Sequence, residues 1–232
     1  MLLQWVILIL LAFLPALAYT IWIRNTERYH REPWIPVLVC FAWGASIAII
    51  ASLVLEQLLG VSLAATLGSA SLYAFAMAVV VAPVVEEATK PLALRLDVVR
   101  RELDEIEDGF IYGAAAGLGF SATENLFYEV SFLGEGLAIF VILVVLRTIG
   151  ACLLHASATA LTGYGYSCTL LSRKACLLRY LGLAILVHAA YNFMVSFQVA
   201  GVAIGVAFAL LFSVSAIRYI RGRIQAFDRA GA

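Results

Sequence analysis

Long apolar stretches constrain this chain of 232 residues more than any other feature. A helix needs about 20 apolar residues to cross the roughly 30 Å of hydrocarbon in a bilayer. Seven stretches of this kind cover residues 3–23, 35–58, 70–92, 110–130, 136–167, 178–197 and 199–218. The sequence therefore predicts an all-α, polytopic bundle of about seven transmembrane helices, forming a single integral-membrane domain over residues 1–232.

The composition excludes the main alternatives to a membrane protein. Hydrophobic residues make up 64% of the chain and charged residues 13%, against about 45–50% and about 25% in soluble domains. A chain this short cannot hide so much apolar surface from water. Basic and acidic residues number 15 each, so the chain lacks the basic excess typical of nucleic-acid binding. We expect a multi-pass protein of the cell membrane, in contact with lipid and with no nucleic-acid partner.

Lys and Arg residues lie in alternate connections between the expected spans. They follow the first, third, fifth and seventh spans, at Arg24, Arg28, Arg31, Arg95, Arg100, Arg101, Arg173, Lys174, Arg179, Arg218, Arg221, Arg223 and Arg229. The connections near 59–69, 131–135 and 198 contain none. Because basic residues mark cytoplasmic loops, we expect the N-terminus outside and the C-terminus in the cytoplasm.

The four cysteines show no metal-binding or redox spacing. Cys40 and Cys152 fall inside expected spans, whereas Cys168 and Cys176 fall near a cytoplasmic connection. We expect all four to be small buried or reduced thiols. The fifth span is long for one crossing, and we expect a kink or break near Gly150.

Polar side chains inside the spans are the candidates for function. Lys90 and Arg147 are the only basic residues away from the cytoplasmic segments, and the other members are Glu86, Glu87, Glu124, Asn125, His155, His188 and Asn192. One charged side chain at the bilayer centre costs about 2.5–3.5 kcal/mol on insertion scales. These groups should therefore face one another or a water-filled cavity. We expect this cavity to open toward the cytoplasm, because Glu86 and Lys90 lie near that end of their span.

Helical spacing brings several of these groups together. Lys90 follows Glu86 by four residues and Glu87 by three, so either carboxylate can pair with the ammonium. His188 and Asn192 share one helix face. Small residues recur every four positions at Gly109, Gly113, Gly117 and Ser121, which favours close packing of a neighbouring helix against the span that carries Glu124. We expect the Glu and His side chains to converge within about 10 Å, since they would be too costly in lipid when unpaired.

Four motifs resemble those of the PrsW-type intramembrane proteases. The run Glu86–Lys90 resembles their EExxK motif, and Phe120–Asn125 resembles FxxxEN. His155, followed by Gly163 and Tyr164, and the run His188–Asn192 resemble their later motifs. The resemblance covers residues 80–195, which we interpret as the catalytic core.

PrsW proteins are grouped with the type II CAAX prenyl endopeptidases and resemble the APH-1 subunit of gamma-secretase. The CAAX enzymes carry EExxxR, FxxxH and HxxxN. Here Lys90 replaces the arginine one position earlier, and Glu124 stands where the first histidine would be, which favours PrsW over prenyl-protein processing. The resemblance implies an endopeptidase that cleaves transmembrane or membrane-proximal bonds of a single-span, membrane-anchored substrate such as an anti-sigma factor.

One mechanism uses the side chains alone. Peptide hydrolysis needs an activated water, a stabilised oxyanion and a proton donor for the leaving amine. Glu86 is the preferred base, and it would share a proton with Glu124. Two residues on one face, His188 and Asn192, would donate hydrogen bonds to the oxyanion.

The remaining polar residues would support this chemistry. His155 would be a second donor or a proton shuttle, and Lys90 would hold Glu87. Asn125 and Arg147 would support the site.

A bound metal ion is the competing mechanism. Glu86, Glu124, His155 and His188 supply oxygen and nitrogen ligands that Zn²⁺ accepts, with room for a water. Because these ligands come from separate helices, their spacing leaves both mechanisms open.

Two functions other than proteolysis are consistent with buried polar groups. A non-catalytic scaffold that binds transmembrane helices, as APH-1 does, would carry the same motifs and would differ only in an activity assay. A proton-coupled transporter would use these residues as a relay, but such proteins often show inverted repeats and broken half-helices, which this sequence lacks.

Overall fold

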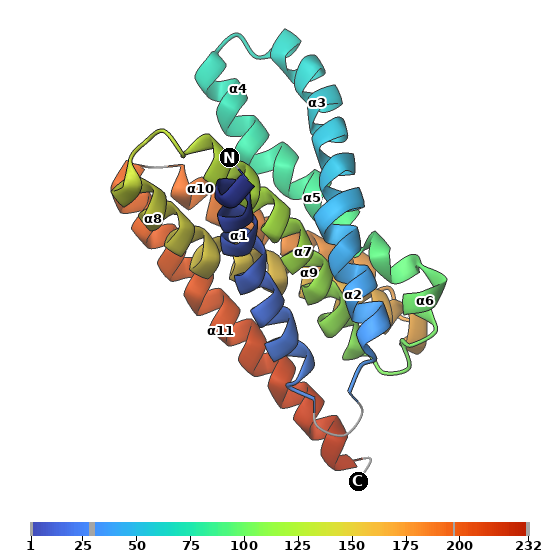
Figure 1. Cartoon of the computed structure of the whole chain (residues 1–232). Helices are drawn as coiled ribbons and strands as arrows, with labels where there is room; N and C mark the ends of the chain where they lie inside the picture. Colours follow the sequence, from blue (N-terminus) through green and yellow to red (C-terminus); the bar gives the residue numbers. More distant parts are fainter. Residues whose placement is uncertain (1, 28–30, 197, 231–232) are drawn as a thin grey trace.

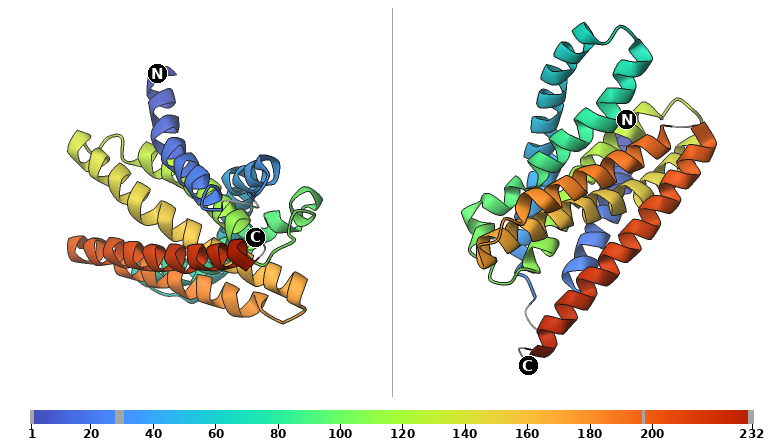
Figure 2. Two further views of the ribbon diagram at one scale, coloured as in Figure 1. Left: turned by 90° about the horizontal axis from the view of Figure 1, so that it is seen from below. Right: turned by 180° about the vertical axis from the view of Figure 1, so that it is seen from behind.

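The computed structural model describes residues 2–27, 31–196 and 198–230, and within these ranges it contains helices and no strand. In chain order the helices are α1 (Leu2–Arg24), α2 (Trp34–Trp43), α3 (Ile49–Thr66), α4 (Ala70–Ala76), α5 (Ala82–Thr89), α6 (Asp97–Arg100), α7 (Asp108–Ser131), α8 (Leu137–Leu146), α9 (Cys152–Ser172), α10 (Leu177–Val195) and α11 (Gln198–Ala230) (Figure 1). Figure 2 shows α10 and α11 on the face that is turned away in Figure 1.

Short irregular segments join several helices into longer continuous runs. Three π-helical turns, η1 (Gly44–Ala48), η2 (Met77–Val81) and η4 (Arg147–Ala151), lie between α2 and α3, α4 and α5, and α8 and α9. The 3₁₀ segment η3 (Lys90–Arg95) continues α5. The irregularity expected near Gly150 is thus a π turn within a continuous helix. Such turns are frequent at functional sites.

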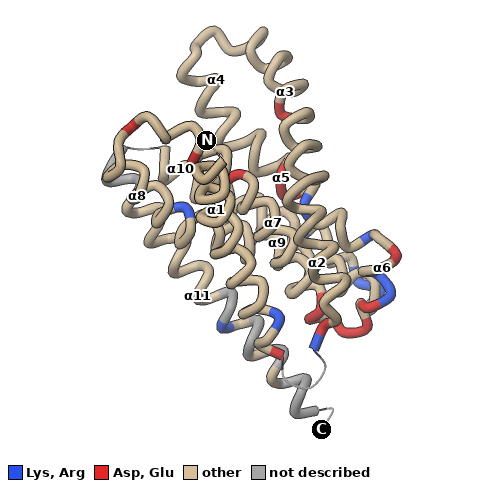
Figure 3. The backbone as a smooth tube through the Cα atoms, viewed as in Figure 1, with Lys and Arg blue, Asp and Glu red and all other residues tan. Residues whose placement is uncertain are grey.

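Five helical runs of the described part are long and apolar enough to cross a membrane. They are Leu2–Arg24, Trp34–Thr66, Ala70–Arg95, Leu137–Ser172 and Leu177–Val195. Helices α7 and α11 occupy the positions of the other two expected spans. The all-α polytopic bundle is confirmed, whereas seven crossings and the sides of the two termini stay predictions. Figure 3 shows basic residues gathered around α6.

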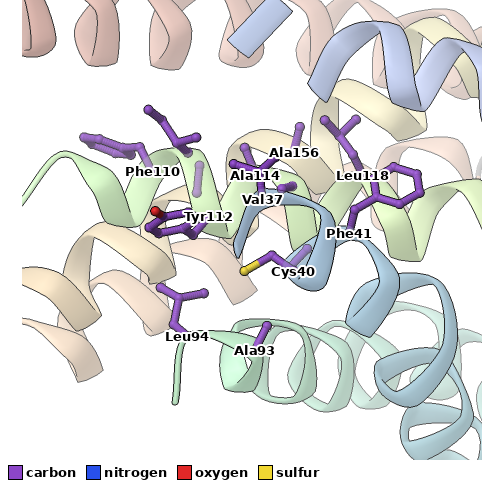
Figure 4. Packing of buried hydrophobic residues seen from close by; sticks show 14 of the residues in the cluster. Val37, Cys40, Phe41, Ala93, Leu94, Phe110, Tyr112, Ala114, Leu118 and Ala156 are labelled. Carbon is purple, nitrogen blue, oxygen red and sulfur yellow. The ribbon is translucent and has the colours of Figure 1, made fainter. Parts of the chain in front are cut away.

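Helix α7 is the centre of the bundle. Its side chains are buried from Asp108 to Ala122, and it packs against α1, α2 and α9. Figure 4 shows Cys40 and Phe41 of α2 together with Tyr112 of α7 in the apolar core. A helix of which every face is buried needs small residues wherever another backbone approaches, and α7 supplies them.

The glycine stripe of α7 lies directly against α9, as the sequence predicts. A Cβ atom at Gly113 would lie 2.5 Å from the carbonyl oxygen of Thr159, and one at Gly117 would lie 2.2 Å from that of His155. The two helices are antiparallel, because Gly109 meets Gly163 at the other end of the contact. This close approach brings the segment of α7 that carries Glu124 beside His155 of α9.

The cysteines only partly match the expectation. Cys40 and Cys152 are free and buried, as expected. The expectation of reduced thiols is wrong for Cys168 and Cys176, which form a disulfide. The turn between α9 and α10 folds the chain back, so that their Cα atoms lie 5.9 Å apart.

A carboxyl cluster connects the segment before α2 to the start of α7. Tyr112 donates a hydrogen bond to Glu32, and Glu32 also hydrogen-bonds Asp108. Burial is the main cause that raises the pKa of Glu32 to about 10, and the charge of Asp108 raises it further. Burial also raises the pKa of Asp108 to about 7. The carboxyl groups of Glu32 and Asp108 are therefore most stable in their protonated, neutral form.

We expect Gly113→Ala to destabilise the protein by about 1–3 kcal/mol, because the added methyl group must push the α9 backbone away. Thermal unfolding in detergent measures the effect. Gly134→Ala is the matched control, since a Cβ there meets nothing within 4 Å. Equal melting temperatures for the two variants would contradict the assigned helix contact.

We expect thermal stability to fall as pH rises from about 6 to about 9. Because the folded-state pKa of Glu32 is raised from 4.5 to about 10, its contribution to stability is complete below pH 4.5 and is lost progressively as pH rises from 4.5 to about 10. Glu32→Gln keeps a neutral side chain and should show a weaker pH dependence in thermal melts. A variant as pH-sensitive as the parent protein would show that Glu32 is not the titrating group.

Candidate active site

A fully buried ammonium group lies at the centre of the polar cluster. Nζ of Lys90 lies 2.9 Å from Oε2 of Glu86 and 2.9 Å from Oε1 of Glu87. It also lies 2.8 Å from Nδ1 of His155 and 4.3 Å from the centre of the Phe120 ring. Both expected carboxylate pairs of Lys90 therefore form at once.

The contacts of Lys90 determine the proton positions on His155. An ammonium has three donors and no acceptor, so Nδ1 of His155 accepts a hydrogen bond from Lys90. The neutral ring then carries its proton on Nε2, which lies 2.9 Å from Oε2 of Glu124. His155 thus connects α5 to α7 by one accepted and one donated hydrogen bond.

His188 is held in a similar way by Glu87. Its Nδ1 lies 3.0 Å from Oε1 of Glu87, while Oε2 of Glu87 accepts a hydrogen bond of 3.0 Å from Thr159. Because Glu87 is an acceptor, Nδ1 of His188 is the donor. The lone pair of Nε2 is left facing Oε2 of Glu86, at 4.0 Å.

Arg147 holds the far side of Glu124. Its guanidinium lies 2.8 Å from Oε2 of Glu124, and Nε donates a 2.6 Å hydrogen bond to Oδ1 of Asn125. The same group stacks on Tyr128, 3.8 Å from the ring centre. The π turn η4 thus presents to α7 a cation that fixes Glu124.

The structure brings Glu86, Glu124, His155 and His188 together, as the sequence predicts. His155 lies 3.8 Å from Glu86 and 2.9 Å from Glu124. The sharing of a proton between Glu86 and Glu124 stays a prediction. Each carboxylate is paired with its own cation.

A cavity of about 550 Å³ lies against this cluster, within the range of about 300–1,000 Å³ typical of ligand sites. Its polar lining includes Glu86, Glu124, His155, His188, Tyr191 and Asn192. Nδ2 of Asn192 donates a 2.8 Å hydrogen bond to the carbonyl of Ala78. An amide nitrogen has two donors, so one N–H of Asn192 remains for a ligand.

The cavity extends away from the arginine-rich connections, and the side of the membrane on which it opens stays a prediction. Its lining continues to Phe132 and Ser196, at the ends of α7 and α10, next to connections that the charge pattern assigns to the outside. At the opposite end, Leu94 of η3 and Val99 of α6 are fully buried in the core.

Three side chains form a candidate metal site. One ligand atom each from Glu86, His155 and His188 lies within 4.8 Å of the others. Three protein ligands that leave a position for water are the pattern of catalytic zinc sites. The donor set fits a metal for a second reason. The ring nitrogens turned away from the candidate site, Nε2 of His155 and Nδ1 of His188, each lie within hydrogen-bond distance of a carboxylate. Histidines that bind metals are usually oriented in this way. Glu124, an expected ligand, is one of these outer carboxylates.

Sequence reasoning missed several residues of the site. Thr159 follows His155 by four residues on α9, and this spacing was a usable signal. Glu56 of α3 lines the cavity, but it lies two residues before the expected end of its span at residue 58, where a charged residue is not unusual. Tyr128 and Tyr191 carried no sequence signal, because aromatic residues are common in apolar helices.

Comparison with known proteins agrees with this geometry. A family model described as PrsW family intramembrane metalloprotease matches residues 32–218. A curated relative named Protease PrsW, from Clostridioides difficile (strain 630), is 34% identical over 125 residues, covering 53% of this chain. The chain spans about half, 51%, of that relative's length. No solved structure gives a significant match. The family match covers most of the chain, which therefore belongs to the PrsW family of intramembrane metalloproteases.

Proposed function

We propose that this multi-pass membrane protein hydrolyses a peptide bond of a membrane-anchored protein, with Glu86 as the general base. The observation that carries the proposal is the placement of Glu86. Its carboxylate borders the cavity, is held by Lys90, and has Nε2 of His188 at 4.0 Å. A carboxylate held this way can take a proton from a water that attacks a carbonyl carbon, and can return it to the leaving amine.

The geometry divides the remaining roles. Asn192 is the donor for the developing oxyanion, because one of its N–H groups remains available. His188 in its neutral form presents a lone pair at Nε2, so we assign it as an acceptor or ligand rather than as the expected oxyanion donor. Glu87 orients His188, and Glu124 orients His155.

We further propose that the site functions with a divalent metal ion, with Zn²⁺ as the first candidate. In this version Glu86, His155 and His188 would hold it, with Glu86 a ligand in place of its role as the base, and the ion would supply a Lewis acid and a more acidic bound water. Nδ1 of His155 would then exchange its hydrogen bond from Lys90 for the ion. The two carboxylates behind the histidines would keep both rings in place.

The proposed substrate is a single-span membrane protein that reaches the site from the lipid phase. The cavity wall opposite the polar cluster is apolar, with Leu143, Leu146, Val195 and Val206. Such a wall suits the apolar side chains of a transmembrane segment. An anti-sigma-factor-like substrate follows from the family resemblance and is part of the proposal.

We expect Glu86→Gln to lower cleavage of a single-span reporter by about 10²–10⁴-fold, because an amide cannot act as a base. The rate is measured on purified protein in detergent, with a thermal melt to show that the variant is folded. Glu135→Gln, on the exposed connection after α7, is the control. Unchanged cleavage by Glu86→Gln would eliminate this mechanism, and a folded wild-type protein without any cleavage would favour the scaffold.

We expect the purified protein to bind about one divalent ion and His188→Ala to lose it, since His188 supplies one of three ligands. Glu87→Gln should bind the ion about 10–100-fold more weakly, because it only orients His188. Elemental analysis and metal titration give both results. If the wild-type protein neither retains nor takes up an ion, the metal-free version of the mechanism is the correct one.

A further inference from the structure

Glu56 is a charged residue of the cavity that the proposed chemistry does not use. It lies in α3, which continues to Thr66, and so falls well inside the apolar run Trp34–Thr66. Its side chain is half-buried and lines the same cavity as Glu86. An ionisable side chain within a membrane span is costly and usually has a functional partner.

The described residues contain no such partner for Glu56. Lys90 pairs with Glu86 and Glu87, and Arg147 pairs with Glu124. In the described part of the chain, Glu56 forms no hydrogen bond or ion pair. Among the carboxylates of the site, Glu56 is thus the one without a cation of its own among the described residues. A carboxylate in this position attracts a positive group.

The candidate metal site does not account for Glu56. The group with ligand atoms within 4.8 Å of one another consists of Glu86, His155 and His188, without Glu56. A single ion bound by those three residues would leave the Glu56 carboxylate with no direct ligand. A positive partner for Glu56 would therefore come from a molecule that enters the cavity.

We propose that Glu56 is a specificity subsite that binds a Lys or Arg side chain of the substrate; this inference rests on the proposed peptidase function. An extended residue spans about 3.3–3.6 Å, and the cavity has a volume of only about 550 Å³. Because Glu56 and Glu86 share this small volume, the basic residue lies within a few positions of the cleaved bond. The long stem of such a side chain also suits the apolar wall.

The test uses three peptides that span the cleavage region and differ at one position, with Lys, Gln or Glu. The wild-type protein should cleave the Lys peptide with a kcat/KM about tenfold or more above that of the Gln peptide, the effect of one partly desolvated charge pair. This ratio should fall to about one in Glu56→Gln. In Glu56→Lys the preference should shift to the Glu peptide, and Glu135→Gln should keep the wild-type ratio.

A binding measurement separates this inference from the proposed chemistry. Fluorescently labelled peptides are titrated into folded Glu86→Gln protein, with and without Glu56→Gln. Preference for the Lys peptide that depends on Glu56 supports the subsite, even if the wild-type protein cleaves nothing and the peptidase proposal fails. Equal preferences with and without Glu56 would overturn the subsite. Loss of the metal ion in Glu56→Gln would also overturn it, by assigning Glu56 to the metal site.

Discussion

The buried ammonium of Lys90 is the interaction on which the rest of the site depends. It balances Glu86 and Glu87, and its third hydrogen bond sets the proton positions on His155. Through Glu87 it also determines which nitrogen of His188 faces the cavity. Removing one partner of a buried ion pair typically costs about 3–5 kcal/mol, so this cation stabilises the helix contacts and the chemistry together.

Local helix geometry explains which parts of the fold and the site could be predicted from the sequence. Spacings of three and four residues place Glu86 and Glu87 next to Lys90 whatever the surrounding fold. The glycine stripe of α7 likewise predicts a close helix contact, although it does not name α9 as the partner. Apolar runs gave the long helices, because a membrane-spanning helix is recognisable from its own residues.

Contacts between helices account for what the sequence did not reveal. Glu124 and His155 meet because α7 and α9 are antiparallel in one register, and no pattern within either helix sets that register. The cavity takes its lining from several helices, so no single span predicts its direction. Glu56 was missed for a related reason: its role depends on a cavity that other helices form.

The size of the cavity has a consequence for the shape of the substrate. An α-helix with its side chains is about 10–12 Å wide, and a volume of about 550 Å³ has room for little more than one turn of it. Carbonyl groups inside an intact helix are also hydrogen-bonded and shielded from an attacking water. Under the proposed function, a transmembrane substrate would have to unwind locally before its backbone reaches Glu86, and the ease of this unwinding, as well as its side chains, would decide where it is cut.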